Sequence, residues 1–228
     1  MLNLFGTERF VSKVRKIARQ ASSQTDLPIV ANQLLGCLGS DASTYECGIV
    51  YAAVAHTYGK DLHRYAENAM MYAQKALSNE LAVAECCEMY MLIVCAHDVR
   101  RKSAKEDERI IRDRQGVFII KGLSYVFDHL RSDTRCSPPS VGKYDVDALD
   151  SQYAAIALEH DRQIRARDYI LLQNRLIDFC DEFCRRMLSL YGEDVIKGGK
   201  LESLMEAACV SAEKKKRISR CLNVLSTR

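Results

Sequence analysis

Apolar residues recur every three or four positions along most of this chain, which is the spacing of one face of an α-helix. Only three prolines interrupt its 228 residues, so few positions break a helix. The pattern predicts about eight helices, at roughly 8–22, 28–39, 44–58, 61–78, 81–98, 104–130, 146–191 and 200–222. We therefore expect an all-α fold, a bundle or irregular array of helices packed as antiparallel hairpins.

Capping residues mark where two of these helices begin. Ser43 is followed three positions later by Glu46, and Ser103 by Glu106, so each pair has the sequence pattern of a capping box. The helix after Ser103 contains the run GVFII at 116–120, whose β-branched residues also suit a strand. Because no partner strand is evident, we expect a helix there.

The clearest interruption is the stretch SDTRCSPPSVGKYD at residues 132–145. Adjacent prolines, a glycine and several serines are typical of a loop or linker. This loop divides the chain into a predicted N-terminal helical lobe, 1–131, and a C-terminal helical lobe, 146–228, that ends in a basic tail.

The C-terminal lobe opens with a helical pattern that runs from 146 to 191 without glycine or proline. A bend near 160–167 would divide it into two helices of ordinary length. Its second half carries apolar residues at steps of three or four, which form a seam suited to packing against other helices or a partner subunit. The partner-binding residues predicted on this seam are Tyr169, Leu172, Leu176, Phe179, Phe183 and Met187.

The net charge of the chain is only +3, but it is unevenly placed. Residues 1–25 carry +4, 26–98 carry −6 and 99–144 carry +5, while 145–192 carry −3 and 193–228 carry +3. Such blocks can neutralise one another within the fold or between subunits, or they can face solvent. Solvated faces are the simpler interpretation.

The ten cysteines fall mostly within apolar, helix-like segments and not in the loops of a secreted disulfide framework. Cys180 and Cys184 share a helix face, but no second pair would complete a tetrahedral zinc site. The cysteines therefore indicate buried free thiols and an intracellular, reducing compartment such as the cytoplasm.

The first 25 residues combine basic side chains with apolar residues that share one helix face. This pattern suits a mitochondrial transit peptide, a helix lying on a membrane surface, or an ordinary first helix whose apolar face joins the core. We favour the last, with peripheral membrane contact through residues 1–20 as an alternative. The longest uncharged stretch, 27–40, is too short to span a bilayer, so no transmembrane segment is predicted.

Residues 44–79 place small and aromatic side chains where two antiparallel helices would touch. Ala55 and Tyr58 stand three apart in the first helix, and the second holds, in order, Ala69, Tyr72 and Ala76. This segment resembles a single tetratricopeptide (TPR) unit, in which small residues allow close approach and the aromatic ring fills the remaining space. The resemblance implies a helical hairpin and a groove for a partner peptide. It departs from the family pattern because no proline closes the unit and no copy follows about 34 residues later.

Candidate catalytic or metal-binding groups are few. His63 and Glu67 lie four apart, which places both on one helix face, but no further ligand motif accompanies them. Cys95 and His97 are two apart and would point in different directions on a helix, so they do not form a nucleophile–base pair. No nucleotide-binding loop, nucleophile elbow or dinucleotide fingerprint occurs. We therefore expect no catalytic residue, metal or cofactor. An enzyme of an unfamiliar helical class would need a pocket lined by His63, Glu67 or His97.

The carboxylates Asp178, Asp181 and Glu182 cluster on one predicted helix, and Arg185 and Arg186 follow one turn later. Ion pairs within the helix explain this spacing better than acid–base catalysis.

Three basic clusters, at 9–19, 100–105 and 214–220, carry an alternative function: binding of nucleic acid or another anionic surface, as in nucleoproteins and matrix proteins. This function requires that the clusters share one face and that affinity falls steeply with salt. The residues concerned are Arg9, Lys13, Lys16, Arg19, Arg100, Arg101, Lys102, Lys214, Lys215, Lys216 and Arg217.

The last cluster also resembles a short nuclear-import signal, which makes the nucleus an alternative compartment. A helix C-terminus equally favours such cations, so a structural use is adequate. Ser103 and Ser219 each follow basic residues, as the sites of basophilic protein kinases do.

Taken together, the helical pattern and the seam favour a non-catalytic protein–protein interaction module, an adaptor or a structural subunit of a larger assembly. Such a module needs a protein partner or a second copy of itself. Nucleic-acid binding is the alternative.

Overall fold

A computed structural model describes residues 4–19, 27–57, 62–103, 107–130, 162–192, 194–197 and 199–226. The regular structure within these ranges is helical and contains no strand, so the predicted all-α class is confirmed. Contacts group the chain into two units, unit 1 (Met1–Phe118) and unit 2 (Ile119–Arg228). The predicted loop at 132–145 lies outside the described residues, and the division into lobes at that loop stays a prediction.

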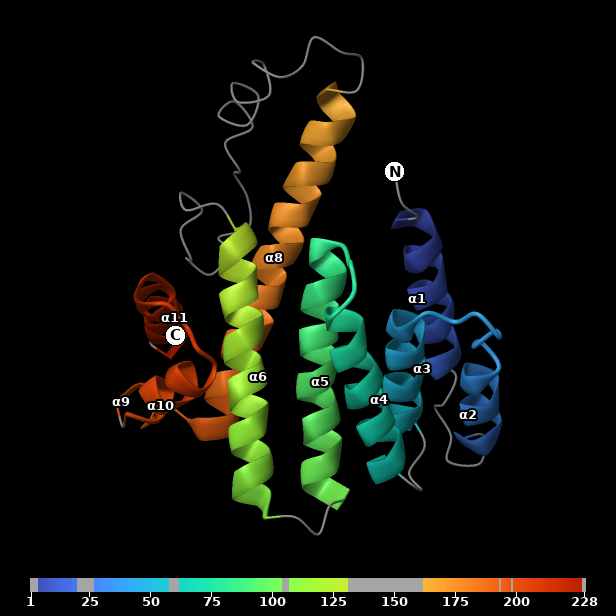
Figure 1. Ribbon diagram of the computed structural model, residues 1–228, viewed down its shortest axis with the longest axis horizontal. Helices are drawn as coiled ribbons and strands as arrows, with labels where there is room; N and C mark the ends of the chain where they lie inside the picture. Colours follow the sequence, from blue (N-terminus) through green and yellow to red (C-terminus); the bar gives the residue numbers. More distant parts are fainter. Residues whose placement is uncertain are drawn as a thin grey trace. The chain divides into compact units, whose positions relative to one another are not determined.

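Unit 1 is a succession of neighbouring helices (Figure 1). They are α1 (Leu4–Arg19), α2 (Leu27–Leu35), α3 (Thr44–Thr57), α4 (Leu62–Leu77), α5 (Val83–Ser103) and the first half of α6 (Glu108–His129). Helix α3 packs against α4, and α4 against α5, while α1 and α2 lie against α3. The amide of Asn79, just after α4, donates to the hydroxyl of Thr44 at the start of α3 (3.1 Å), so these two helices run antiparallel.

The start of α3 is fixed by the capping box that the sequence predicts. The backbone N–H of Ser43 donates to a carboxylate oxygen of Glu46 (2.9 Å), and the N–H of Glu46 donates to the hydroxyl of Ser43 (3.2 Å). Two amide groups that the helix itself leaves unpaired are thereby satisfied, which is worth about 1 kcal/mol.

The sequence predicts Ser103 as the cap of α6, and this prediction is wrong. Ser103 is the last residue of α5, which continues five residues beyond its expected end at Asp98. The chain enters α6 at Asp107 instead, whose carboxylate accepts the backbone N–H of Arg109 (2.8 Å). Residues 116–120 lie within α6, so this run is helix and not strand.

Small side chains allow the helices of unit 1 to approach closely. Ala66, Ala69, Ala73 and Ala76 form one face of α4, and each is fully buried. These alanines lie in one apolar cluster with residues of α3 and α5. The hairpin implied by the TPR resemblance at 44–79 is therefore present, with small residues where the helices meet.

Three tyrosine rings stack along one side of this hairpin. Tyr51 of α3 lies parallel to Tyr72 of α4, with ring centroids 5.4 Å apart, and also stacks with Tyr65 at 6.4 Å. Aromatic pairs of this kind add about 1 kcal/mol beyond the area they bury. Burial raises the pKa of Tyr51, and the neighbouring tyrosines and Cys47 raise it further. We call these three residues the tyrosine ladder.

The apolar face of α1 packs inside unit 1, as expected of an ordinary first helix. Val14 is buried in a cluster with residues of α2 and α3, and Phe10 and Ile17 pack against that cluster. None of the described helices combines the length and the apolar character that crossing a membrane requires.

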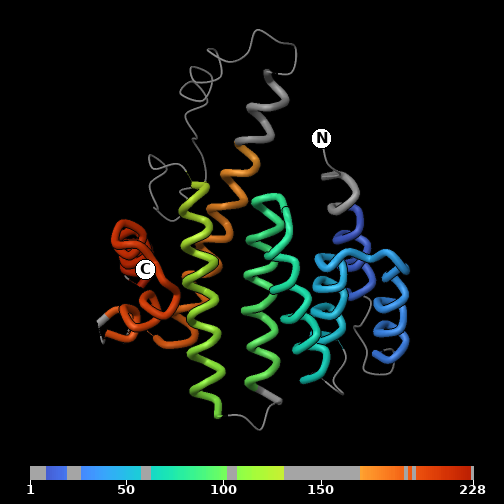
Figure 2. Tube along the Cα trace, in the orientation of Figure 1, coloured from blue at the N-terminus to red at the C-terminus, as the bar shows by residue number. Residues whose placement is uncertain are grey.

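Unit 2 begins with the second half of α6, and its described residues from 162 onward form four more helices. They are α8 (Arg162–Tyr191), α9 (Asp194–Lys197), α10 (Lys200–Ala207) and α11 (Ala212–Ser226). Helices α9, α10 and α11 gather at the end of α8 (Figure 2). The buried amide of Gln173 in α8 donates to the carbonyl of His129 at the end of α6 (3.2 Å), which ties these two helices together.

A large ring packs directly on a glycine in the core of unit 2. Phe183 of α8 is fully buried, and its ring lies against Gly122 of α6. A Cβ atom added at Gly122 would stand 2.4 Å from the Cζ atom of this ring. Glycine is required here because any side chain would collide with Phe183.

The sequence pattern predicts a single helix over 200–222, and the structure divides it into α10 and α11. Cys209 has a positive φ of 56°. The N–H of Val210 donates to the carbonyl of Met205 (3.0 Å), and the N–H of Cys209 to that of Glu206 (2.9 Å). These two bonds are the Schellman motif, which ends a helix through one residue in the left-handed conformation.

Candidate functional site

After the turn at Cys209, α11 continues in a different direction from α10, and a groove of about 840 Å³ is lined by residues of both helices. We call it the α10–α11 groove. It is lined by Ile196, Gly199, Leu201, Glu202, Met205, Lys215, Lys216, Ser219, Arg220, Asn223 and Val224. This volume is within the range of pockets that hold ligands or partner side chains.

The groove is lined by both apolar and polar side chains, and it carries several cations. Leu201 and Met205 are buried beneath it, while Lys216 and Arg220 are exposed. Lys215 also lines the groove, 3.9 Å from a carboxylate oxygen of Glu206. The only carboxylate among the lining residues is Glu202, so three cations and one anion leave a net charge of +2.

Helix α11 uses its other basic residues to dock on α6. Lys214 pairs with Asp128 at 2.6 Å. Arg217 donates to the carbonyl of Phe127 (3.1 Å), and its guanidinium lies 4.5 Å from the centroid of the Phe127 ring. A cation placed on the last turn of a helix is stabilised by the exposed carbonyls there. The predicted basic tail is therefore two sets of residues with different surroundings.

The other predicted basic clusters are in unit 1. Arg9, Lys13, Lys16 and Arg19 are exposed on α1. Arg100 lies 3.7 Å from Glu67, and Arg101 lies 3.6 Å from Asp98, so both already have carboxylate neighbours. The side chain of Lys102 lies outside the described residues.

The predicted seam on α8 is largely core. Leu176, Phe183 and Met187 are fully buried, and a residue without exposed surface cannot contact a partner unless the fold opens. Leu172 and Phe179 are half-buried. The side chain of Tyr169 lies outside the described residues. That this seam binds a partner stays a prediction, now resting on Leu172 and Phe179.

His97 is buried between α5 and α6, where only 3 % of it is exposed. Neither ring nitrogen has a hydrogen-bond partner within the described structure, and its ring lies 5.8 Å from that of Phe118. Burial, together with the charges of Arg100 and Arg114, lowers the pKa of His97 to about 4, while Asp98 opposes the shift. His97 is therefore neutral near pH 7.

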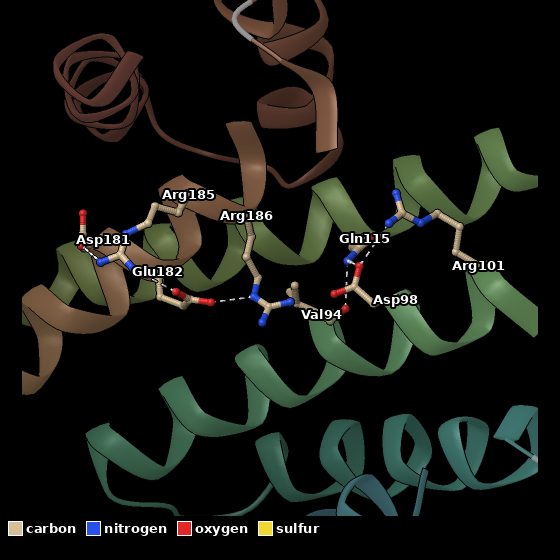
Figure 3. A network of polar contacts seen from close by, with 8 residues as sticks. All are labelled: Val94, Asp98, Arg101, Gln115, Asp181, Glu182, Arg185 and Arg186. Carbon is tan, nitrogen blue, oxygen red and sulfur yellow. Dashed lines mark hydrogen bonds and ion pairs between the residues drawn. The ribbon is translucent and has the colours of Figure 1, made fainter. Parts of the chain in front are cut away.

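A buried glutamine lies in the same helix pair (Figure 3). The side-chain amide of Gln115 donates to the carbonyl of Val94 (2.9 Å) and to the carboxylate of Asp98 (2.7 Å). These bonds fix α5 against α6 within unit 1. A polar group buried with its donors satisfied costs far less than an unpaired one.

Figure 3 also shows the ion pairs predicted within α8. Arg185 pairs with Asp181 and with Glu182, and Arg186 pairs with Glu182 at 2.8 Å. The prediction that these charges pair within their own helix is confirmed.

The remaining candidates for chemistry are His63 and Glu67. They form a surface pair at 3.1 Å on α4, with Arg100 beside the same carboxylate. No group of three or more His, Cys, Asp or Glu residues is close enough to hold a metal ion within the described ranges.

No family model, curated protein or solved structure matches the chain. The candidate site accordingly rests on its own geometry.

Sequence reasoning missed most of the groove. Leu201, Met205 and Glu202 belong to a segment predicted as the start of one continuous helix, so nothing indicated that they face α11. Only two signals marked this region: the basic run at 214–220 and Ser219 within it.

Proposed function

We propose that this protein is a non-catalytic helical interaction module that binds an acidic segment of a protein partner in the α10–α11 groove. The observation that carries the proposal is an open groove that combines apolar side chains on its walls with the cations Lys215, Lys216 and Arg220. Such a surface matches a segment that presents carboxylates beside one or two apolar side chains.

The cations of the groove favour an anionic partner. Lys216 and Arg220 form no ion pair with any described residue, so their charges are available to a partner. Exposed cations act mainly on the rate of association and on the choice of partner, because water still screens them.

The apolar side chains of the groove supply affinity that its cations cannot. Leu201 and Met205 form its buried wall, and Ile196 and Val224 are half-buried at its sides. An apolar side chain that enters such a groove contributes roughly 1.5–3 kcal/mol when it is fully buried. Binding energy at protein interfaces is typically concentrated in a few anchors of this kind.

The test is site-specific crosslinking in cells that make the protein. The photoreactive residue p-benzoyl-phenylalanine replaces Asn223, on the groove, or Glu213, an exposed residue of α11 that does not line it. We expect a protein to be crosslinked from position 223 only, through a segment rich in Glu or Asp. A synthetic peptide of that segment should then bind the purified chain, and the double variant Lys216→Glu, Arg220→Glu should weaken binding at least tenfold.

Equal crosslinking from both positions, or a captured segment whose binding ignores the charge reversal, would contradict the proposal. Light scattering of the purified chain tests whether the partner is a second copy of the chain. Self-association through the groove should be lost in the same double variant.

Nucleic-acid binding is the second candidate, and the exposed cations of α1 favour it. Arg9, Lys13 and Lys16 are spaced by four and three residues, so they follow one face of that helix. This function predicts that affinity for a single-stranded oligonucleotide falls steeply with salt and that Lys13→Ala with Lys16→Ala reduces the salt dependence. Affinity that is insensitive to both changes would exclude it.

A further inference from the structure

Ser219 lies on the wall of the α10–α11 groove. It is half-buried and lines the groove on α11. Lys215 and Lys216 precede it by four and three residues, so both lie on the same side of the helix one turn away. Arg220 follows directly and also lines the groove. A negative group on Ser219 would thus sit among the three cations that the acidic partner is proposed to use.

The residues before Ser219 are those that basophilic protein kinases select. Lys214, Lys215, Lys216 and Arg217 occupy the positions from five to two residues before the serine. The same residues serve the fold in other ways, since Arg217 contacts Phe127 and Lys214 contacts Asp128. The other serine with this context, Ser103, ends α5, and its side chain lies outside the described residues.

We infer that Ser219 is a phosphorylation site and that its phosphate closes the α10–α11 groove to the acidic partner. This inference rests on the proposed function of the groove. A kinase would transfer the γ-phosphoryl group of ATP to the Ser219 oxygen, which breaks the bond between that phosphorus and the bridging oxygen of the β-phosphate. The products are phosphoserine, ADP and the proton released from the hydroxyl.

The phosphate closes the groove by charge and by occupancy. It adds about −1.5 to −2 at neutral pH, which cancels most or all of the net charge of +2 on the lining residues. Its oxygens can accept hydrogen bonds from Lys215 and Lys216 of the preceding turn. The cations are then paired internally, and a carboxylate of the partner meets a phosphate instead of an ammonium group.

Transfer requires that α11 opens locally, because protein kinases hold their substrate segment extended. Ile218, Cys221 and Leu222 of α11 are buried in unit 2, so opening this segment costs free energy. Phosphorylation should therefore proceed faster when α11 is loosened. The variant Arg217→Lys keeps a cation in the kinase motif but loses the bidentate, planar group that lies on Phe127.

The test uses full-length protein in which phosphoserine is encoded at position 219. A matched protein carries phosphoserine at Ser203, an exposed residue of α10 that does not line the groove. The probe is a fluorescein-labelled peptide of alternating Glu and Leu residues, followed by fluorescence anisotropy. We expect the unmodified and Ser203-phosphorylated proteins to bind alike and the Ser219-phosphorylated protein to bind at least tenfold more weakly. Treatment with a phosphatase should restore the affinity.

The outcomes separate the two proposals. Binding by the unmodified protein that phosphoserine at 219 leaves unchanged would overturn this inference and leave the groove's function standing. No binding by the unmodified protein, or binding that the double variant Lys216→Glu, Arg220→Glu leaves unchanged, would overturn the proposed function and this inference with it. Circular dichroism shows whether the phosphorylated chain is folded, and Ser219→Asp supplies a smaller charge change that should weaken binding in the same direction. Protein from its native source that carries no phosphate on Ser219 would also overturn the inference.

Discussion

In unit 1 the helices meet through small side chains, whereas in unit 2 a large ring and several cations hold them together. The contrast is clearest at two glycines. Gly48 of α3 lies beside Ala73 and Met89, and an added Cβ would stand 3.5 Å from its nearest neighbours, an ordinary contact distance. Gly122 of α6 lies under Phe183, where the same atom would collide. A glycine within a helix can therefore be replaceable, as at Gly48, or required, as at Gly122. Only the residue packed against it distinguishes the two cases.

The units also differ in what they leave exposed. Along α4 of unit 1, four alanines are buried in contacts with α3 and α5. In unit 2, α10 and α11 diverge after Cys209 and leave the groove open. Close packing through alanine leaves little room between helices, while a sharp turn followed by longer side chains leaves a recess.

The largest effect should come from filling the contact beneath Phe183. Gly122→Ala places a methyl group 2.4 Å from the ring, and we expect a loss of about 3 kcal/mol in the free energy of unfolding. Urea denaturation followed by circular dichroism measures it. The matched variant Gly48→Ala should be neutral or gain up to about 1 kcal/mol, because alanine has the higher helix propensity. In the Gly122→Ala background, the smaller side chain of Phe183→Leu should relieve the collision and recover part of the lost stability.

Equal effects of the two glycine variants would show that close approach does not distinguish the units as described.

The second-largest effect should be a loss of stability at acidic pH, caused by His97 in unit 1. Because the pKa of His97 in the folded protein is about 4, below the value near 6.5 expected of the unfolded chain, the unfolded state takes up the proton first. Stability should therefore fall as pH falls from about 6.5 to 4. Between pH 7 and pH 4.5 we expect His97 to contribute a loss of about 2.5 kcal/mol.

His97→Leu should remove this contribution, whereas His56→Leu, at an exposed position of α3, should retain it. The measurement is the free energy of unfolding of each protein at the two pH values. Parallel pH profiles for wild type and His97→Leu would contradict a neutral, buried His97.

The smallest effect separates the two faces of α11. Arg217→Ala removes a charged hydrogen bond to the Phe127 carbonyl and the contact with its ring, so we expect a loss of about 1.5 kcal/mol. Lys216→Ala changes the preceding, exposed residue and should alter stability by less than about 0.5 kcal/mol. In the peptide-binding assay the order should be reversed, because Lys216→Ala should weaken binding more than Arg217→Ala does. Similar stability losses for both would mean that α11 has no division between docking and exposed cations.

Local features of this fold could be predicted from the sequence, because they depend on neighbours in the chain. Ser43 and Glu46 meet across one helical turn, and the pattern alone locates the start of α3. The same holds for Arg185 and Arg186, whose partner carboxylate lies one turn earlier in the helix. The alanines of α4 indicated close packing for the same reason, since their spacing defines a face.

What faces a given surface could not be predicted in this way. The spacing on α8 correctly indicated an apolar face, but not that Gly122 of α6 covers Phe183 in place of a partner. The groove depends on the left-handed conformation of Cys209, a position where helix ends usually carry glycine, so the sequence offered no signal for a break. A helix periodicity carries across such a turn unchanged, which is why α10 and α11 were expected to be one element.

The tyrosine ladder gives this protein an optical probe of its own. The chain has no tryptophan, so tyrosine dominates its near-ultraviolet absorption and emission. Rings stacked as closely as Tyr51 and Tyr72 share their excitation, and the resulting dichroism signal disappears when α3 and α4 separate. Unfolding of this hairpin can therefore be followed by light alone, without a dye or an engineered label.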